Sequence, residues 1–209
     1  QRSEGILLRY LSQLYKTLHQ NVPDWAKDEA VWDVVGFLRA MIERVDTSLI
    51  EEWESLAHPE LILSREAEDS REAHRILAWE ELLGNPRAFT ARVRAELHQF
   101  VASLARRDFE EAAATIRSDP GDPDTHWTAE SLERATAPFF ERFGSLVFDH
   151  RARLADKTQL TPDGDREWQV VQVLVDPEDE NLWCVEGRID LRTPASVDGP
   201  LVAVTRIGT

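Results

Sequence analysis

The sequence predicts an α+β protein in which a bundle of helices comes first and a four-stranded antiparallel sheet comes last. Up to about residue 143, apolar side chains recur at steps of three and four, the period of an amphipathic helix. Two later runs rich in β-branched and aromatic residues, 168–175 and 182–191, flank the turn-forming residues 176–181 and predict a β-hairpin. Helices followed by consecutive strands are typical of an α+β fold and not of a parallel nucleotide-binding sheet.

The first half of the chain is predicted to be helical. Apolar residues at helical spacing run from Ile6 to Leu18, and this helix is expected to end near Asn21. Pro23 suits the first turn of a short helix. Further helices are expected over 31–45, 49–56 and 71–83, the second capped by Thr47 or Ser48 and the third closed by Gly84 in a left-handed conformation.

The helices of the second half carry clear start signals. They are expected over 86–104, 109–116 and 128–143, with Asn85, Asp108 and Thr128 as N-caps. Pro138 is expected to kink or split the last of them, because its ring removes a backbone hydrogen bond and clashes with the preceding turn. Gly144 is expected to end it.

Four strands are expected after these helices. The alternation of apolar and polar residues from Leu146 to Leu154 predicts the first, and Pro162–Gly164 predicts the turn that follows it. The others are expected over 168–175, 182–191 and 201–207. In the third strand one side is apolar and the other is charged. The apolar side carries Trp183, Val185, Ile189 and Leu191, and the charged side carries Glu186, Arg188 and Asp190. One face of the sheet therefore needs an apolar cover, which the helices can provide.

Two domains are expected, a helical domain over residues 1–83 and an α+β domain over residues 84–209. A chain of 209 residues with 42% hydrophobic content can bury one substantial core or two small ones. The apolar cluster 61–63 interrupts the connection between the two parts and favours intimate packing.

The charge and the cysteine content exclude several classes of protein. A net charge of −15 disfavours a nonspecific binder of nucleic acid or of anionic membranes, because the long-range attraction has the wrong sign. No apolar run approaches the roughly 18 residues of a membrane span. Cys184 is the only cysteine, so no disulfide can form within the chain, and a cytoplasmic location is expected. Because the chain starts at Gln1 directly before a helical pattern, we expect it to be a piece of a longer protein.

Two basic clusters stand out from this acidic background. They are the places where we expect phosphate or an acidic partner to bind: Arg87, Arg92, Arg94, Arg106 and Arg107 in one cluster, and Arg151 and Arg153, followed by Lys157, in the other. The alternative interpretation is a mixed-charge surface whose arginines pair with nearby carboxylates such as Glu96, Glu110 or Asp156.

The sequence predicts no catalytic residue and no metal site. It lacks a glycine-rich phosphate loop with Lys-Ser or Lys-Thr, and it lacks an HExxH pattern. The carboxylates of the loop 119–124 lack the spacing of a calcium loop. The residues that could line a cavity or move a proton are His126, Asp149, His150 and Trp168, although a histidine placed like His150 is more often a core or cavity-rim residue and Trp168 could instead stack on a base.

Several sequence runs carry a resemblance to a known family. The runs Gly5–Leu18, Val45–Glu54 and Asp163–Trp168 resemble the C-terminal region, described as a domain of unknown function, of actinobacterial superfamily II DEAD/DEAH-box helicases. The resemblance extends over essentially the whole chain, and none of its motifs is catalytic. It implies that ATP and magnesium bind only in two motor domains upstream, so no cofactor is expected in this chain.

A second resemblance covers residues from about 86 onward. Residues 107–112, followed by a helix and then by strands, are similar to nuclear-transport-factor-2-like (cystatin-like) folds. This resemblance implies a curved, cone-like sheet with helices on one face and a pocket between them.

These resemblances imply different functions. As part of a helicase, the chain would be a non-catalytic accessory region that positions RNA, DNA or a protein partner beside the motor domains of the same polypeptide. As a free cone fold, it would bind or transform a small apolar molecule. A generic protein-interaction module is the third possibility.

Overall fold

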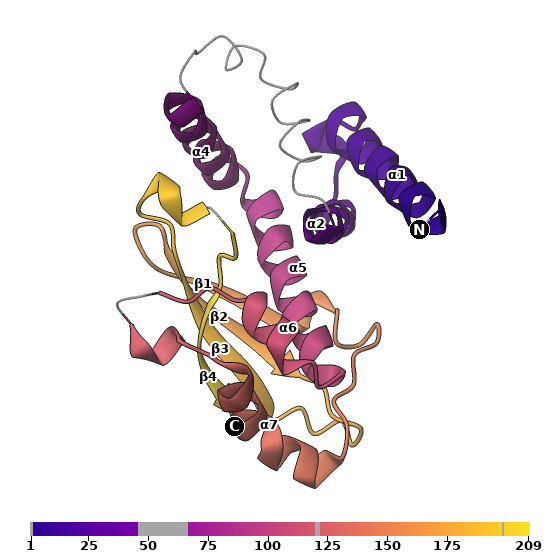
Figure 1. Ribbon diagram of the computed structural model, residues 1–209, viewed down its shortest axis with the longest axis vertical. Coiled ribbons are helices and arrows are strands. Elements are labelled where there is room, and N and C mark those ends of the chain that lie inside the picture. Colours follow the sequence, from indigo (N-terminus) through magenta and orange to yellow (C-terminus); the bar gives the residue numbers. More distant parts are fainter. Residues whose placement is uncertain (1, 46–66, 120–121, 198) are drawn as a thin grey trace. The chain divides into compact units, whose positions relative to one another are not determined.

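The computed structural model describes residues 2–45, 67–119, 122–197 and 199–209. It is a mixture of helices and one antiparallel sheet, which confirms the predicted α+β class (Figure 1). The chain divides into two compact units, Gln1–Ala95 and Glu96–Thr209, so the division falls inside one long helix. The expected boundary at Leu83 lies upstream of this division, and the expectation of two separately folding domains stays a prediction.

The helical unit contains α1 (Arg2–Lys16), α2 (Glu29–Val45), α4 (Ala67–Gly84) and the first half of α5 (Pro86–Ala105). A π-helical turn, Thr17–Asn21, and a 3-10 turn, Asp24–Ala26, connect α1 to α2. The first helical stretch thus ends at Asn21, as predicted. The helix predicted over 49–56 lies outside the described residues.

One hydrophobic cluster of the helical unit packs α2 closely on α5. Its buried residues are Tyr15, Trp32, Val35, Leu38, Ile42 and Ala91. At Gly36 a Cβ atom would lie 2.9 Å from the backbone oxygen of Ala91, so only glycine permits this approach of the two helices.

Of the two caps predicted at the junction of α4 and α5, one is present and the other is not. The amide of Ala88 donates to the side chain of Asn85 at 3.1 Å, which confirms Asn85 as the N-cap of α5. Gly84 is the last residue of α4 and lies outside the left-handed region, so its prediction as a left-handed cap was wrong. The reason is that α5 starts two residues later, which leaves no room for a separate C-terminal motif.

The α+β unit begins with the second half of α5 and continues with α6 (Phe109–Ala114) and α7 (Ala129–Phe143). Asp108 and Thr128 cap α6 and α7 as predicted, and Thr128 forms a capping box with Ser131. Gly144 ends α7 with a φ of 75°. Pro138 does not split α7, which is one continuous helix.

The sheet has the order β1-β2-β3-β4, with every neighbouring pair antiparallel. Its strands are β1 (Thr158–Gly164), β2 (Glu167–Leu174), β3 (Trp183–Asp190) and β4 (Ala203–Gly208). In β3, Val185, Gly187 and Ile189 are buried, as the alternation predicted. Phe139 of α7 packs edge-on against Trp183, with 5.6 Å between ring centroids, so α7 lies against this apolar face.

The first predicted strand is in the wrong place. Residues 146–154 form bends and turns with one isolated bridge, between Val147 and Val175, and the first strand is β1 instead. The Asp149 side chain accepts a hydrogen bond from the amide of Arg151 at 2.8 Å. Such local side-chain bonds compete with a strand ladder, and the alternating pattern does not reveal them.

Candidate functional site

The three predicted arginines of the helical unit lie on α5. Arg94 is only 7% exposed, and its Nη1 donates to Glu29 Oε1 at 2.7 Å and approaches Asp33 Oδ2 at 3.3 Å. Burial raises the pKa of Asp33, and the nearby guanidinium of Arg94 opposes that rise. Arg87 donates to the backbone oxygen of Lys27 at 3.4 Å, and Arg92 is half-buried. Arg94 therefore holds the helical unit together.

Arg106 and Arg107, at the end of α5, have different surroundings. Arg106 forms an ion pair of 2.5 Å with Glu111. Arg107 has a φ of 56° and is exposed, and its Nη2 donates to the backbone oxygen of Gly144 at 3.2 Å. Its guanidinium carbon lies 4.4 Å from the centroid of the Phe140 ring, a cation–π contact.

The second basic cluster lies in the turns after α7. Arg151 is held by two carboxylates, Asp149 at 3.1 Å and Asp179 at 3.0 Å. The pKa of Asp149 lies below its ordinary value, chiefly because its carboxylate accepts the backbone amide of Arg151. Arg153 is exposed, donates to the backbone oxygen of Asp149 at 3.3 Å, and lies 5.9 Å from the centroid of the Phe148 ring.

The candidates for a cavity lie on different elements. His126 is exposed in the loop after α6, with its Nδ1 3.1 Å from the Ser118 hydroxyl, and His150 is exposed in a turn. His150 is therefore not on the apolar face of a strand, as the predicted strand required. Trp168 is half-buried on β2. These positions do not form one acid–base constellation.

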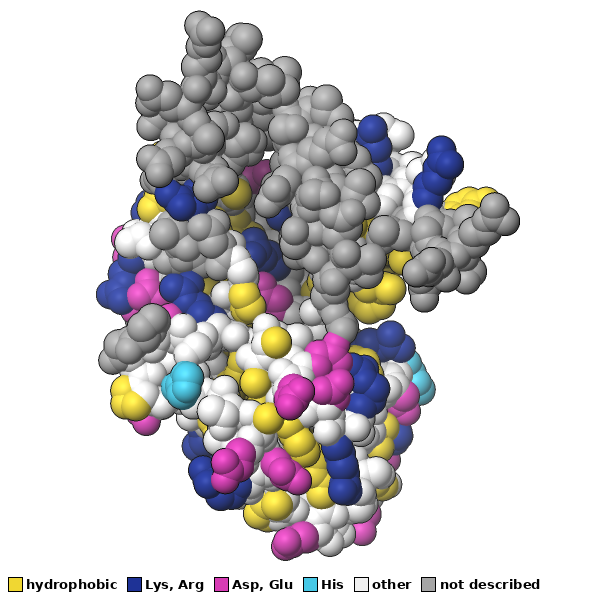
Figure 2. Space-filling model, viewed as in Figure 1, with side chains coloured by type: hydrophobic (Ala, Val, Ile, Leu, Met, Phe, Trp, Pro, Cys, Tyr) yellow, Lys and Arg dark blue, Asp and Glu magenta, His cyan; other side chains and the backbone are white. Residues whose placement is uncertain are grey.

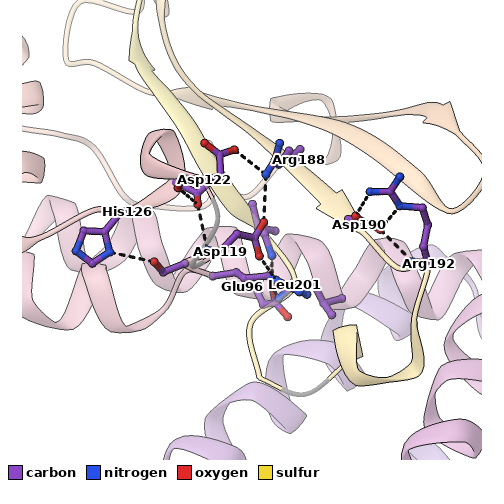
Figure 3. Close-up of polar contacts among 12 residues, drawn as sticks. Glu96, Asp119, Asp122, His126, Arg188, Asp190, Arg192 and Leu201 are labelled. Atoms are coloured by element: carbon purple, nitrogen blue, oxygen red, sulfur yellow. Dashed lines mark hydrogen bonds and ion pairs between the residues drawn. The ribbon is translucent and has the colours of Figure 1, made fainter.

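A polar cluster that the sequence did not reveal joins the loop after α6 to β3 (Figure 3). Arg188 lies between two carboxylates of that loop, 2.7 Å from Asp122 and 3.3 Å from Asp119. Arg117 donates to Asp119 at 2.8 Å, and the buried hydroxyl of Thr125 accepts the Asp119 amide at 3.0 Å. The pairing of Arg188 with Asp119 joins residues far apart in sequence, so no local spacing could have indicated it.

The same cluster ties the loop to the edge of the sheet. Trp127 Nε1 donates to the backbone oxygen of Val204 at 2.8 Å. The carboxylate of Glu96 accepts the amides of Leu201 and Val202, at 2.8 and 3.3 Å (Figure 3). The contact of Trp127 occupies backbone of β4, the last strand of the sheet, and Glu96 holds the two residues that precede β4. The cluster is thus an edge cover, with its carboxylates already neutralised.

The described part of the chain offers no metal centre. Among those residues no group of three or more His, Cys, Asp or Glu side chains is arranged to hold a metal ion. None of the described helices is long and apolar enough to cross a membrane. On its visible face the α+β unit shows acidic and basic side chains interspersed (Figure 2).

The fold and the site define an α+β protein with a helical unit, whose charged side chains are engaged largely in structural contacts. Within that class, the chain belongs to the family described as Domain of unknown function (DUF3516), whose model matches residues 1–207. No curated protein and no solved structure matches the chain.

Proposed function

We propose that this chain is a non-catalytic accessory region of an ATP-dependent nucleic-acid helicase, positioning nucleic acid or a protein partner beside the motor domains of the same polypeptide. The observation that carries the proposal is the resemblance of the runs Gly5–Leu18, Val45–Glu54 and Asp163–Trp168 to the C-terminal region of such helicases. ATP and magnesium belong to the motor domains in this proposal. The lone Cys184 favours a cytoplasmic setting.

The geometry favours positioning over chemistry. In the described residues, Asp149 holds the amide and side chain of Arg151, and Arg188 holds Asp119 and Asp122, so these groups stabilise loops. His126 and His150 are exposed on separate loops. A general acid or base needs a partner within hydrogen-bond reach of a bound substrate, in a site that excludes water.

A second candidate is a small-molecule-binding cone fold, which the buried polar pair Thr158 and Gln172 favours. Gln172 is fully buried on the helix-covered side of β2 and accepts a 2.6 Å hydrogen bond from the Thr158 hydroxyl. Polar groups at such a position can orient a ligand. Gln172 also donates to the backbone oxygen of Val173, which leaves little of its bonding capacity for a ligand.

The reading frame upstream of Gln1 tests the proposal. A helicase parent requires a phosphate-binding loop with Lys-Ser or Lys-Thr and a DExH box in the same frame, because these groups hold the nucleotide and magnesium. A frame that encodes neither would overturn the helicase role and leave the partner-binding or small-molecule alternatives.

A further inference from the structure

The arginines of the α+β unit differ in what their side chains contact. Most are held by carboxylates: Arg106, Arg117, Arg142, Arg151, Arg188, Arg192 and Arg206. Arg107 and Arg153 differ, since among the described residues each side chain contacts a backbone oxygen and a phenyl ring. Within the described part of the chain, neither guanidinium forms an ion pair with a carboxylate.

Both side chains are held in place in spite of their exposure. The backbone oxygen of Gly144 and the ring of Phe140 position Arg107, and the backbone oxygen of Asp149 and the ring of Phe148 position Arg153. A guanidinium that lies on a ring loses less conformational freedom on binding, and it keeps N–H donors and its outer face for a ligand.

The two arginines flank one short segment. The oxygens that they contact belong to Gly144 and Asp149, five residues apart, so an extended chain places them at most about 18 Å from each other. Two fixed cations that contact backbone oxygens of one short segment, each beside an aromatic ring, suit a flexible polyanion that carries planar groups. Single-stranded nucleic acid has this chemistry, because its phosphates pair with guanidinium groups and its unpaired bases stack on their planes.

We infer that Arg107 and Arg153, with Phe140 and Phe148 beneath them, form a contact surface for single-stranded nucleic acid along residues 144–149. This inference rests on the proposed function and names its substrate class. A duplex fits less well, since its bases are not available to stack. The acidic charge of the chain repels a polyanion at long range, so the contact acts within a Debye length of roughly 8 to 10 Å and is salt-sensitive.

The test measures binding of a fluorescent oligothymidine to the full 209-residue chain at several salt concentrations. The variant is Arg107→Gly with Arg153→Ala, because glycine tolerates the positive φ of residue 107. The control is Arg134→Ala with Arg206→Ala, which removes the same charge; Arg134 is exposed on α7, and Arg206 pairs with Glu186. Thermal melts of both variants establish that they fold. Arg153→Ala alone serves as a second variant, because it leaves the backbone at residue 107 unchanged.

The expected result is a loss of affinity of about tenfold in the double variant, with the control near wild type. The slope of log affinity against log salt should become shallower by about 1.4, since each single-strand phosphate contact contributes about 0.7. The proposed contact surface would be wrong if the double variant and the control lost the same affinity for oligothymidine. It would also be wrong if the chain bound duplex as tightly as oligothymidine. Competition by polyglutamate as strong as that by oligothymidine would overturn the nucleic-acid assignment.

The two proposals can fail separately. If the double variant loses binding and no motor sequence lies upstream of Gln1, the proposed contact surface stands and the helicase role is rejected. Unchanged binding beside a genuine motor sequence would reject the surface and retain the accessory role.

Discussion

Arg94 shows how a cation that looks available in the sequence can be committed to stability. Its guanidinium lies 2.7 Å from Glu29 and 3.3 Å from Asp33, while it is almost completely buried. The sequence places it in a basic cluster, and only the approach of α2 to α5 supplies its partners. Burial of a side chain and pairing across distant segments are the two properties that local spacing does not encode.

Replacing Arg94 by Ala should lower the free energy of unfolding of the helical unit by about 1–3 kcal/mol, because Asp33 then keeps a partly buried charge without its partner. Urea unfolding followed by circular dichroism measures the change. Arg9→Ala, at an exposed position on α1, is the matched control and should stay within about 0.5 kcal/mol. Equal effects of the two substitutions would show that the Arg94 pairs contribute little.

The pKa of Asp190 provides a test of a single ion pair. It lies below its ordinary value chiefly because the carboxylate accepts hydrogen bonds from the side chain of Arg192. A lowered carboxylate pKa contributes stability that is present above the unfolded-state value and is lost as pH falls through the folded-state value. Arg192→Ala should raise the pKa of Asp190 towards 3.8, as measured by NMR titration of the carboxyl carbon. An unchanged titration would contradict the contact.

At the scale of the elements, helix N-caps were a more reliable signal than alternation. Asn85, Asp108 and Thr128 cap the helices that they were expected to cap, because a cap depends on residues within one turn. Residues 146–154 show the limit of such reasoning: the pattern has period two, yet Asp149 bends the chain. The Arg107–Phe140 contact joins the turn after α5 to α7, across more than thirty residues, so the sequence could indicate the arginine and not the ring beneath it.

The loop between β2 and β3 depends on one buried carboxylate. Asp176 is fully buried and accepts three backbone amides, those of Glu178, Glu180 and Asn181. Asp176→Ala should reduce the free energy of unfolding by about 3 kcal/mol, because these donors lose their acceptor. Glu178→Ala, at an exposed position of the same loop, should change it by less than about 0.5 kcal/mol. Similar results from the two variants in chemical denaturation would refute this role of Asp176.

At the scale of the whole molecule, the chain consists of two compact units, and the division between them along the sequence falls within α5. The order of helices and strands led to the expectation of two domains, 1–83 and 84–209, and this expectation stays a prediction. The position of the division follows from tertiary packing, since Ala91 of α5 belongs to the core of the helical unit. That assignment requires contacts between helices, which no single segment reveals.

Two glycine substitutions separate the stabilities of the units. At Gly36 a Cβ atom would lie 2.9 Å from the oxygen of Ala91, and at Gly187 it would lie 2.9 Å from the oxygen of Ala203. Gly36→Ala should destabilise the helical unit, and Gly187→Ala the α+β unit, each by about 1–3 kcal/mol. Hydrogen exchange should therefore show lower protection in one unit at a time. Loss of protection in both units from either substitution would mean that they unfold as one body.

The central claim, an accessory region without chemistry of its own, is tested most directly by ATP hydrolysis and duplex unwinding measured on the parent polypeptide with and without these 209 residues. The account predicts that the isolated chain hydrolyses no ATP, and that the parent lacking it still hydrolyses ATP but unwinds duplex less efficiently. ATP turnover by the highly purified chain, or unwinding that is unaffected by the deletion, would contradict the account.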